Sequence, residues 1–242
     1  MKFKFIILSI CIGLFSGATF AQSVILTNKK VTYKRPKPQM ESKRSFTINF
    51  PIVRAATPSL SAKITKAVNP LTVLKINLKE ELNEYQWLEA ADYEVNYNAN
   101  GILCLDLFME GSAAYPSSST KTVVVDGRTG IVVRAASVFT NMPSLIARLN
   151  EMQEKEIATA IVEIKKDATN EEPNPEPLFE DATFTAANLE GFVVTEEGVT
   201  FKYNYGFPHA ILALQPDGTF FFTWSQIKPF IKPGGLLSRI TR

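Results

Sequence analysis

Residues 120–133 read TKTVVVDGRTGIVV, in which two runs of β-branched residues flank a turn. Asp126-Gly127 and Gly130 tolerate the backbone angles of a tight turn, so this stretch predicts a β-hairpin. Apolar and polar residues also alternate over 93–97 and over 103–109, around the turn sequence Asn-Ala-Asn-Gly. This pattern predicts a second hairpin directly before the first. Two consecutive hairpins indicate one antiparallel sheet.

Strand and helix patterns lie on both sides of these hairpins. Residues 45–53 alternate with a period of two and predict a strand, and Pro51 places it at a sheet edge or ends it. Residues 59–87 read as one or two helices, interrupted at Asn69-Pro70. After Asn141, a suitable N-cap, residues 145–164 carry apolar side chains at helical spacing and predict a long helix.

The C-terminal third also contains predicted strands and a short helix. Residues 192–205 predict a third hairpin, residues 219–224 predict a strand, and Ser225 is expected to cap a short helix that ends at Ile231. The segment DATNEEPNPEPLFED at 167–181 is acidic and rich in proline, so we expect it to be exposed and mobile. The predicted fold class is α+β, an antiparallel β-sheet built from hairpins and packed against helices.

The first 21 residues have the pattern of a signal peptide. Lys2 and Lys4 precede a short apolar run, and small residues lead to a cleavage position after Ala21. The run is too short to span a membrane, and no later stretch is longer, so no transmembrane segment is expected after signal removal. The mature chain is therefore expected to be exported, to the periplasm or the extracellular space.

Removal of the signal also limits the classes of function. Two of the 26 basic residues leave with it, so 24 remain against 24 acidic residues, and the balanced charge argues against nucleic acid as a partner. Cys11 leaves too, which makes Cys104 the only cysteine and excludes an internal disulfide. Stability must then come from an apolar core.

Charge distribution suggests how the mature chain is divided. Residues 22–44 form a basic N-terminal arm, expected to be either a flexible arm or an edge strand followed by a linker. Such an arm could bind anionic envelope polymers, although a charged run is more often simply solvated. Residues 45–242 are expected to form a single α+β domain, within which a small N-terminal subdomain at about 45–90 is possible.

Five stretches resemble a domain family of uncharacterised function from the bacterial envelope. They are KKVTYKR at 29–35 with SFTINFPIV at 45–53, VVVDGRTGIVVRAASVFTN at 123–141, FVVTEEGVTFKYNYGFPHA at 192–210, and FFFTWSQIKPFIKPGG at 220–235. The family forms the extracellular domain of a lysozyme-sensing anti-sigma factor and the N-terminal region of a peptidoglycan deacetylase. The resemblance implies an exported, non-catalytic binding or sensing module whose partner is lysozyme, another envelope protein or peptidoglycan.

The candidate binding residues lie in two loops. Members of the family often carry a Gly-Ala-His-Pro-like loop after the second hairpin strand, where this chain has GSAAYPSSST at 111–120. Tyr115 and Pro116 in this loop, together with Phe207, Pro208 and His209, are expected to be exposed and to contact a ligand. The departure from the family's loop leaves the implied partner open.

A rival hypothesis is an enzyme that acts on cell-wall glycan, as a hydrolase or deacetylase. Asp126, His209 and Asp217 are the only polar residues available for such an active site, and they would have to converge in a pocket. Each aspartate also precedes a turn glycine, which explains it without chemistry. His209 is the only histidine and Cys104 lies within a predicted strand, so neither a metal site nor a cofactor is expected. A purely structural envelope protein is the third possibility.

Overall fold

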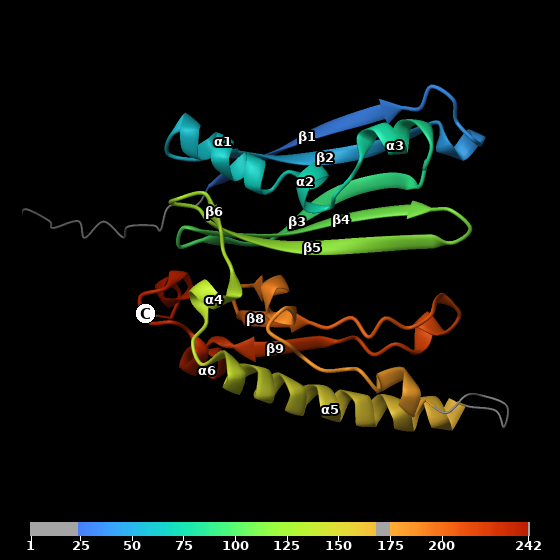
Figure 1. The fold of residues 1–242 in the computed structure, drawn as a ribbon. Coiled ribbons are helices and arrows are strands. Elements are labelled where there is room, and N and C mark those ends of the chain that lie inside the picture. The colour runs from blue at the N-terminus through green and yellow to red at the C-terminus, as the bar shows by residue number, and fades with distance from the viewer. Residues whose placement is uncertain (1–23, 168–174, 242) are drawn as a thin grey trace, which may run out of the picture.

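The computed structural model describes residues 24–167 and 175–241, and it contains two β-sheets (Figure 1). The predicted signal peptide and residues 168–174 of the acidic segment lie outside the described residues. The six-stranded sheet has the order β1-β2-β3-β4-β5-β6, and the three-stranded sheet has the order β7-β8-β9. The strands are β1 (Ile25–Lys34), β2 (Ser45–Arg54), β3 (Leu88–Ala99), β4 (Ile102–Ser112), β5 (Pro116–Asp126), β6 (Ile131–Val132), β7 (Val193–Val194), β8 (Gly198–Lys202) and β9 (Thr219–Thr223).

Helices lie between β1 and β2, β2 and β3, β6 and β7, and β8 and β9, and one of them is long. The α-helices are α1 (Pro58–Ala67), α2 (Pro70–Val73), α3 (Leu78–Asn83), α4 (Ala135–Val138), α5 (Met142–Asp167) and α6 (Trp224–Ile227). The 3₁₀ helices are η1 (Glu41–Lys43), η2 (Glu176–Phe179), η3 (Asn188–Gly191), η4 (His209–Leu214), η5 (Lys228–Phe230) and η6 (Leu236–Arg239). The predicted α+β class is confirmed.

Of the two predicted hairpins, β3–β4 lies at the centre of the larger sheet, whereas β5–β6 pairs at only two positions and ends the sheet. Strands β3 and β4 pair antiparallel across Asn100 and Gly101, whose φ angles of 55° and 69° are those that a tight hairpin turn requires. Strands β4 and β5 pair over eleven positions, from Ile102 with Asp126 to Ser112 with Pro116. Strand β2 lies parallel to β3, because helices α1 to α3 carry the chain back between them. The sheet therefore has one parallel pair that the sequence pattern did not predict.

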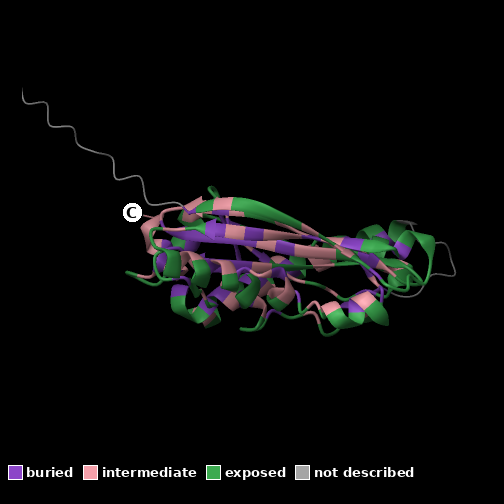
Figure 2. Cartoon of the chain, turned by 90° about the horizontal axis from the view of Figure 1, so that it is seen from above, coloured by how far each residue is buried: buried purple, intermediate pink, exposed green. Residues whose placement is uncertain are grey.

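The two faces of this sheet support two cores. Odd-numbered residues of β4, such as Leu103 and Leu105, face α1 to α3, whereas Ile102 and Cys104 face the C-terminal half. The C-terminal half consists of the smaller sheet and α5, which lies on its outer side (Figure 1). Seen from above, buried positions alternate with less buried ones along the strands (Figure 2). Each strand of the central hairpin thus contributes to both cores.

The C-terminal core is rich in aromatic residues. Phe201 of β8 has no exposed surface and lies 5.5 Å from the ring of Phe139 and 5.9 Å from that of Phe222. Leu145 and Leu149 of α5 are fully buried against this cluster, which confirms the amphipathic helix predicted at 145–164. The close packing of these side chains fixes α5 along the smaller sheet.

Several local expectations need correction. Strand β2 is internal in the sheet, but its pairs with β3 end at Ile48, so Pro51 lies beyond them and no donor is missed there. Helix α6 is capped by Thr223 in a capping box with Gln226, rather than by Ser225. In the acidic segment, Phe179 of η2 is buried, so this part is packed rather than mobile.

The basic arm is partly buried. Its residues 25–34 form the edge strand β1, which is one of the two alternatives expected from the sequence. Arg35 and Lys43 are 4% and 5% exposed, and they pair with Glu81 and Glu89. Both side chains also donate to backbone carbonyl groups, among them those of Leu88 and Trp87. These two charges hold the turn after β1 against the start of β3, so they are not free for anionic polymers.

Candidate functional site

The two candidate binding loops meet at one end of the molecule. The ring of Tyr115, between β4 and β5, packs against the imidazole of His209 at the start of η4, with ring centroids 4.7 Å apart. Tyr115 is 64% exposed, and Pro116, Pro208 and His209 are exposed as well. The fold therefore brings together two stretches that the sequence singled out separately.

Phe207 differs from the other four candidates because it is buried. Its ring lies 5.2 Å from that of Phe179, and its backbone N–H donates to Gln215 Oε1 at 3.0 Å. Its exposed fraction is only 7%. Contrary to the exposure expected for it, Phe207 anchors the loop that presents Pro208 and His209.

Other loops extend this end of the molecule. The backbone N–H of Gln39 donates to Gln86 Oε1 at 2.9 Å, and Trp87 Nε1 donates to Ser117 Oγ at 3.1 Å. These contacts join the turn after β1, the segment before β3 and the start of β5 into one surface. We define the end face by its exposed members, which are Met40 (57% exposed), Tyr85 (72%), Tyr115, His209, Leu212 (47%) and Leu214 (37%).

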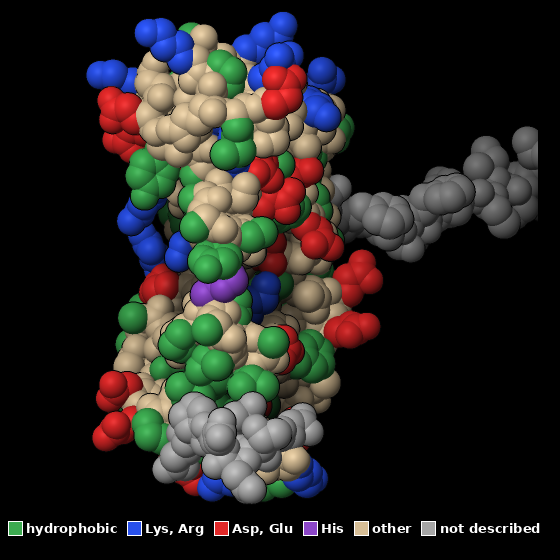
Figure 3. All heavy atoms as spheres, turned by 90° about the vertical axis from the view of Figure 1, so that its right-hand side faces the viewer, with side chains coloured by type: hydrophobic (Ala, Val, Ile, Leu, Met, Phe, Trp, Pro, Cys, Tyr) green, Lys and Arg blue, Asp and Glu red, His purple; other side chains and the backbone are tan. Residues whose placement is uncertain are grey.

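Figure 3 views the molecule from this side. Hydrophobic side chains, drawn in green, lie above and below the purple imidazole of the chain's single histidine. Sequence reasoning missed Met40, which lies in the basic arm, and Tyr85, which lies in the segment predicted as helical but follows the end of α3 at Asn83. Only the convergence of the turns shows that they belong to the same surface as Tyr115.

A polar groove of about 850 Å³ lies between β5 and the C-terminal half. Lys202 Nζ of β8 lies 2.9 Å from Asp106 Oδ2 of β4, and Thr122 Oγ1 donates to the other oxygen of that carboxylate. This ion pair therefore ties the two halves together at the groove. Hydroxyl and amide groups dominate its lining, which includes Ser118, Thr120, Thr122, Asn188, Asn204 and Gln215.

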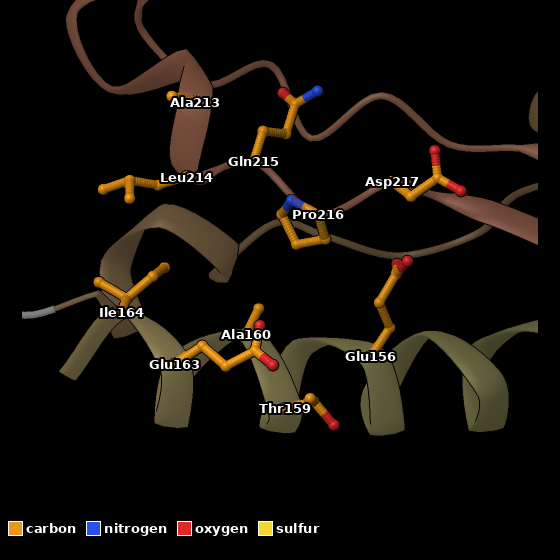
Figure 4. A pocket seen from close by; sticks show the side chains of 10 residues that line it. All are labelled: Glu156, Thr159, Ala160, Glu163, Ile164, Ala213, Leu214, Gln215, Pro216 and Asp217. Atoms are coloured by element: carbon orange, nitrogen blue, oxygen red, sulfur yellow. The ribbon is translucent and has the colours of Figure 1, made fainter. Parts of the chain in front are cut away.

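A second cavity, of about 540 Å³, lies between α5 and the segment before β9 (Figure 4). Glu156, Glu163 and Asp217 line it. Glu156 is already engaged, because it accepts hydrogen bonds from the Tyr205 hydroxyl and from the backbone N–H of Gly218. Burial, followed by the bond to Glu156, raises the pKa of Tyr205. The tyrosine is therefore a neutral donor that fixes this carboxylate, and within residues 24–167 and 175–241 no cluster suited to a metal ion is found.

The three polar residues of the enzyme hypothesis do not converge. Both side-chain oxygens of Asp126 accept hydrogen bonds from Arg239 at 3.0 Å. Burial raises the pKa of Asp126, but the hydrogen bond from Arg239 and that from the N–H of Arg128 outweigh it and lower the pKa. Asp126 ends β5, whereas His209 contacts Tyr115 beside the first residue of that strand. The two are separated by roughly 30 Å, the length of such a strand.

Cys104 is also unsuited to catalysis. Its side chain has no exposed surface, and its sulfur accepts the N–H of Val194 at 3.3 Å. Burial raises the pKa of the thiol to about 12, so the reactive thiolate is scarce at neutral pH. The residue packs the centre of β4 against β7, as its position within a predicted strand suggested.

The part of the chain that the structure describes has no helix both long and apolar enough to cross a membrane. No protein-family model matches the sequence, and no curated protein matches it.

Solved structures do share the fold. One is a member of the DUF3298 family from Bacteroides fragilis, with a TM-score of 0.55 and 14% identity over 91% of this chain and 99% of that one. Another is a DUF3298 family protein from Pseudomonas aeruginosa, with a TM-score of 0.55 and 14% identity over 88% and 95% of the two chains. At this identity the likeness concerns the fold alone. The structural neighbours of this chain are thus proteins of an uncharacterised domain family.

Proposed function

We propose that the mature chain is an exported, non-catalytic binding or sensing module of the cell envelope, and that it docks a protein partner on the end face. The observation that carries this proposal is the exposure of Tyr85 and Tyr115, at 72% and 64%, on turns that neighbouring contacts hold in place. Tyrosine offers a large apolar area with a polar tip, and it is enriched among the residues that dominate binding energy.

The state of the chemically capable residues supports a role without catalysis. Asp126 is held by Arg239, Glu156 is held by Tyr205 and Gly218, and the Cys104 thiol is buried. Each of these groups stabilises the fold in its present position. The end face, in contrast, presents side chains that have few partners of their own.

Lysozyme is the protein partner that the family resemblance implies. In this chain Tyr115 and Pro116 occupy the loop where family members often carry a histidine, and His209 reaches the same place from the C-terminal half. The tyrosine and the imidazole together can supply the aromatic surface and hydrogen-bonding groups of a binding loop. The proposal is therefore open to a direct test with lysozyme itself.

The test is retention of residues 22–242 on immobilised lysozyme at near-physiological salt. We expect the wild-type chain to be retained. Tyr85→Ala and Tyr115→Ala should each raise the dissociation constant by about tenfold, as loss of an interface tyrosine commonly does. Val162→Ala, which removes an exposed apolar residue of α5, is the matched control. Equal retention of all four proteins would place binding elsewhere, and no retention would remove lysozyme as the partner.

The groove supports a second candidate function, the binding of peptidoglycan glycan. Its hydroxyl and amide lining matches the hydrogen-bonding groups of a sugar chain, and its volume of about 850 Å³ is within the range of ligand sites. Co-sedimentation with isolated sacculi tests this. Thr120→Trp should fill the groove and release the protein from sacculi, whereas Thr72→Trp on α2 should not. Sedimentation that Thr120→Trp leaves unchanged contradicts glycan binding in the groove.

A further inference from the structure

The outer edge of β1 is a surface that neither proposal uses. β1 pairs with β2 along its full length, from Ile25 with Arg54 to Lys34 with Ser45. It is the first strand of the sheet and forms its upper border in Figure 1. Within the described residues no strand pairs with its other side. Ten residues of edge strand therefore offer backbone N–H and C=O groups to a further strand.

A cavity of about 390 Å³ lies beside this edge. Val31 and Tyr33 of β1 face it, because side chains two residues apart share one face of a strand. Phe50 and Ile52 of β2 line it too, and Leu71 of α2 closes one side. Helices α1 and α2 pack on β2, so their cover stops short of β1 and leaves these apolar side chains only half-buried.

The opposite face of β1 carries the charge. Lys30 and Lys34 are exposed on that face, and Lys29 is exposed at the rim of the cavity. None of the three takes part in an ion pair among the described residues. A second copy of β1 paired antiparallel about Lys29 or about Lys30 would place that lysine opposite its own copy, and like charges in that arrangement are destabilising. The occupant that complements this edge is acidic.

We propose that the outer edge of β1 binds an extended acidic segment of another protein, which joins the sheet as an additional antiparallel or parallel strand. Alternate residues of this segment are apolar and enter the cavity beside Val31 and Tyr33. The residues between them carry carboxylates that face Lys30 and Lys34. Backbone hydrogen bonds provide the affinity, and the cavity and the lysines determine which peptide sequences bind.

The test uses designed peptides, because the natural segment is unidentified. Blocked nonapeptides carry valine, isoleucine, leucine or phenylalanine at alternate positions, with glutamate in one set, lysine in a second set, and a central proline in a third. Their binding to residues 22–242 is measured by fluorescence anisotropy. We expect at least one glutamate peptide to bind, at least tenfold more tightly than its lysine and proline counterparts.

Variants assign the binding to β1. Lys30→Glu/Lys34→Glu should weaken the glutamate peptides at least tenfold and strengthen the lysine peptides, whereas Lys79→Glu/Lys155→Glu, at exposed lysines of α3 and α5, should change neither. Bound peptide should slow hydrogen exchange of the β1 amides. Tyr115→Ala should bind peptide as wild type does, which separates this site from the end face.

Three results would overturn the inference. They are the absence of binding by every glutamate peptide, equal binding of the glutamate and lysine sets, and slowed exchange at a strand other than β1. A dimer whose formation protects the β1 amides would overturn it as well, because a second copy would then occupy the edge.

Discussion

Replacement of Arg35 should destabilise this protein more than replacement of any exposed lysine of the same basic segment. The guanidinium is fully buried and donates to three carbonyl groups, those of Glu81, Lys43 and Leu88, at 2.8, 3.1 and 2.7 Å. It also pairs with the Glu81 carboxylate at 3.3 Å and lies 4.7 Å from the centre of the Phe46 ring. These contacts join β1, η1, α3 and β3.

The expected magnitudes follow from these contacts. Arg35→Met leaves the Glu81 carboxylate without its cation, and loss of one partner of a buried pair costs about 3–5 kcal/mol. Arg35→Lys keeps the charge but has no planar fork to reach three carbonyls, so we expect a loss of about 2 kcal/mol. Arg35→Met/Glu81→Gln removes the uncompensated charge and should be more stable than Arg35→Met by about 1–2 kcal/mol.

The assay is urea unfolding of residues 22–242 followed by circular dichroism, with Lys30→Met on β1 as the control for loss of a basic residue. The control should stay within about 0.5 kcal/mol of the wild type, as exposed substitutions usually do. If Arg35→Lys were as stable as the wild type, or if the double variant were less stable than Arg35→Met, the argument from the buried network would be refuted.

Three further outcomes are expected from the described contacts. The pKa of Asp126 is lowered in the folded protein, so its pair with Arg239 stabilises the fold above the unfolded carboxyl pKa of about 3.9. This stabilisation is lost as the pH falls through the lower pKa of the folded state. The urea concentration at the unfolding midpoint should therefore fall between pH 6 and pH 3, and it should fall less in Asp126→Asn. An equal fall in the variant and in the wild type would contradict this. Cys104 should resist a thiol reagent at pH 8 until the chain is unfolded, and rapid labelling of the native protein would show that its burial is incomplete. Phe207→Ala should lower the free energy of unfolding by about 3 kcal/mol and Tyr115→Ala by less than about 0.5 kcal/mol, and equal losses in thermal or urea denaturation would contradict their assigned positions.

Local signals were sufficient for most of the secondary structure. The turn residues around Gly101 and around Asp126-Gly127 predicted the hairpins β3–β4 and β5–β6, because turn residues and β-branched residues lie within a few positions of each other. The spacing of apolar residues over 145–164 likewise predicted the core of α5. Each of these patterns depends on residues that are close in sequence, and the corresponding hairpins and helix are present in the structure.

The candidate site was only partly predictable. Tyr115 and His209 were chosen separately as exposed loop residues, and no local pattern could show that their rings touch. Phe207 follows Gly206 and precedes Pro208, a loop sequence that gives no sign of the aromatic neighbour, Phe179, that buries it. The partner that covers an aromatic side chain lies far along the chain, so its burial is a tertiary property.

The sequence by itself determined the hairpins β3–β4 and β5–β6, the long helix and the α+β class, because turn chemistry and hydrophobic periodicity are local. Only the tertiary structure decided that β2 lies parallel to β3, and that Arg35 and Lys43, which read as part of a solvated basic run, are buried beside Glu81 and Glu89. The same is true of the end face, which exists only where four separate turns meet. Burial of a charge depends on a partner supplied from a distant segment, and no pattern within the run itself encodes where that partner will be.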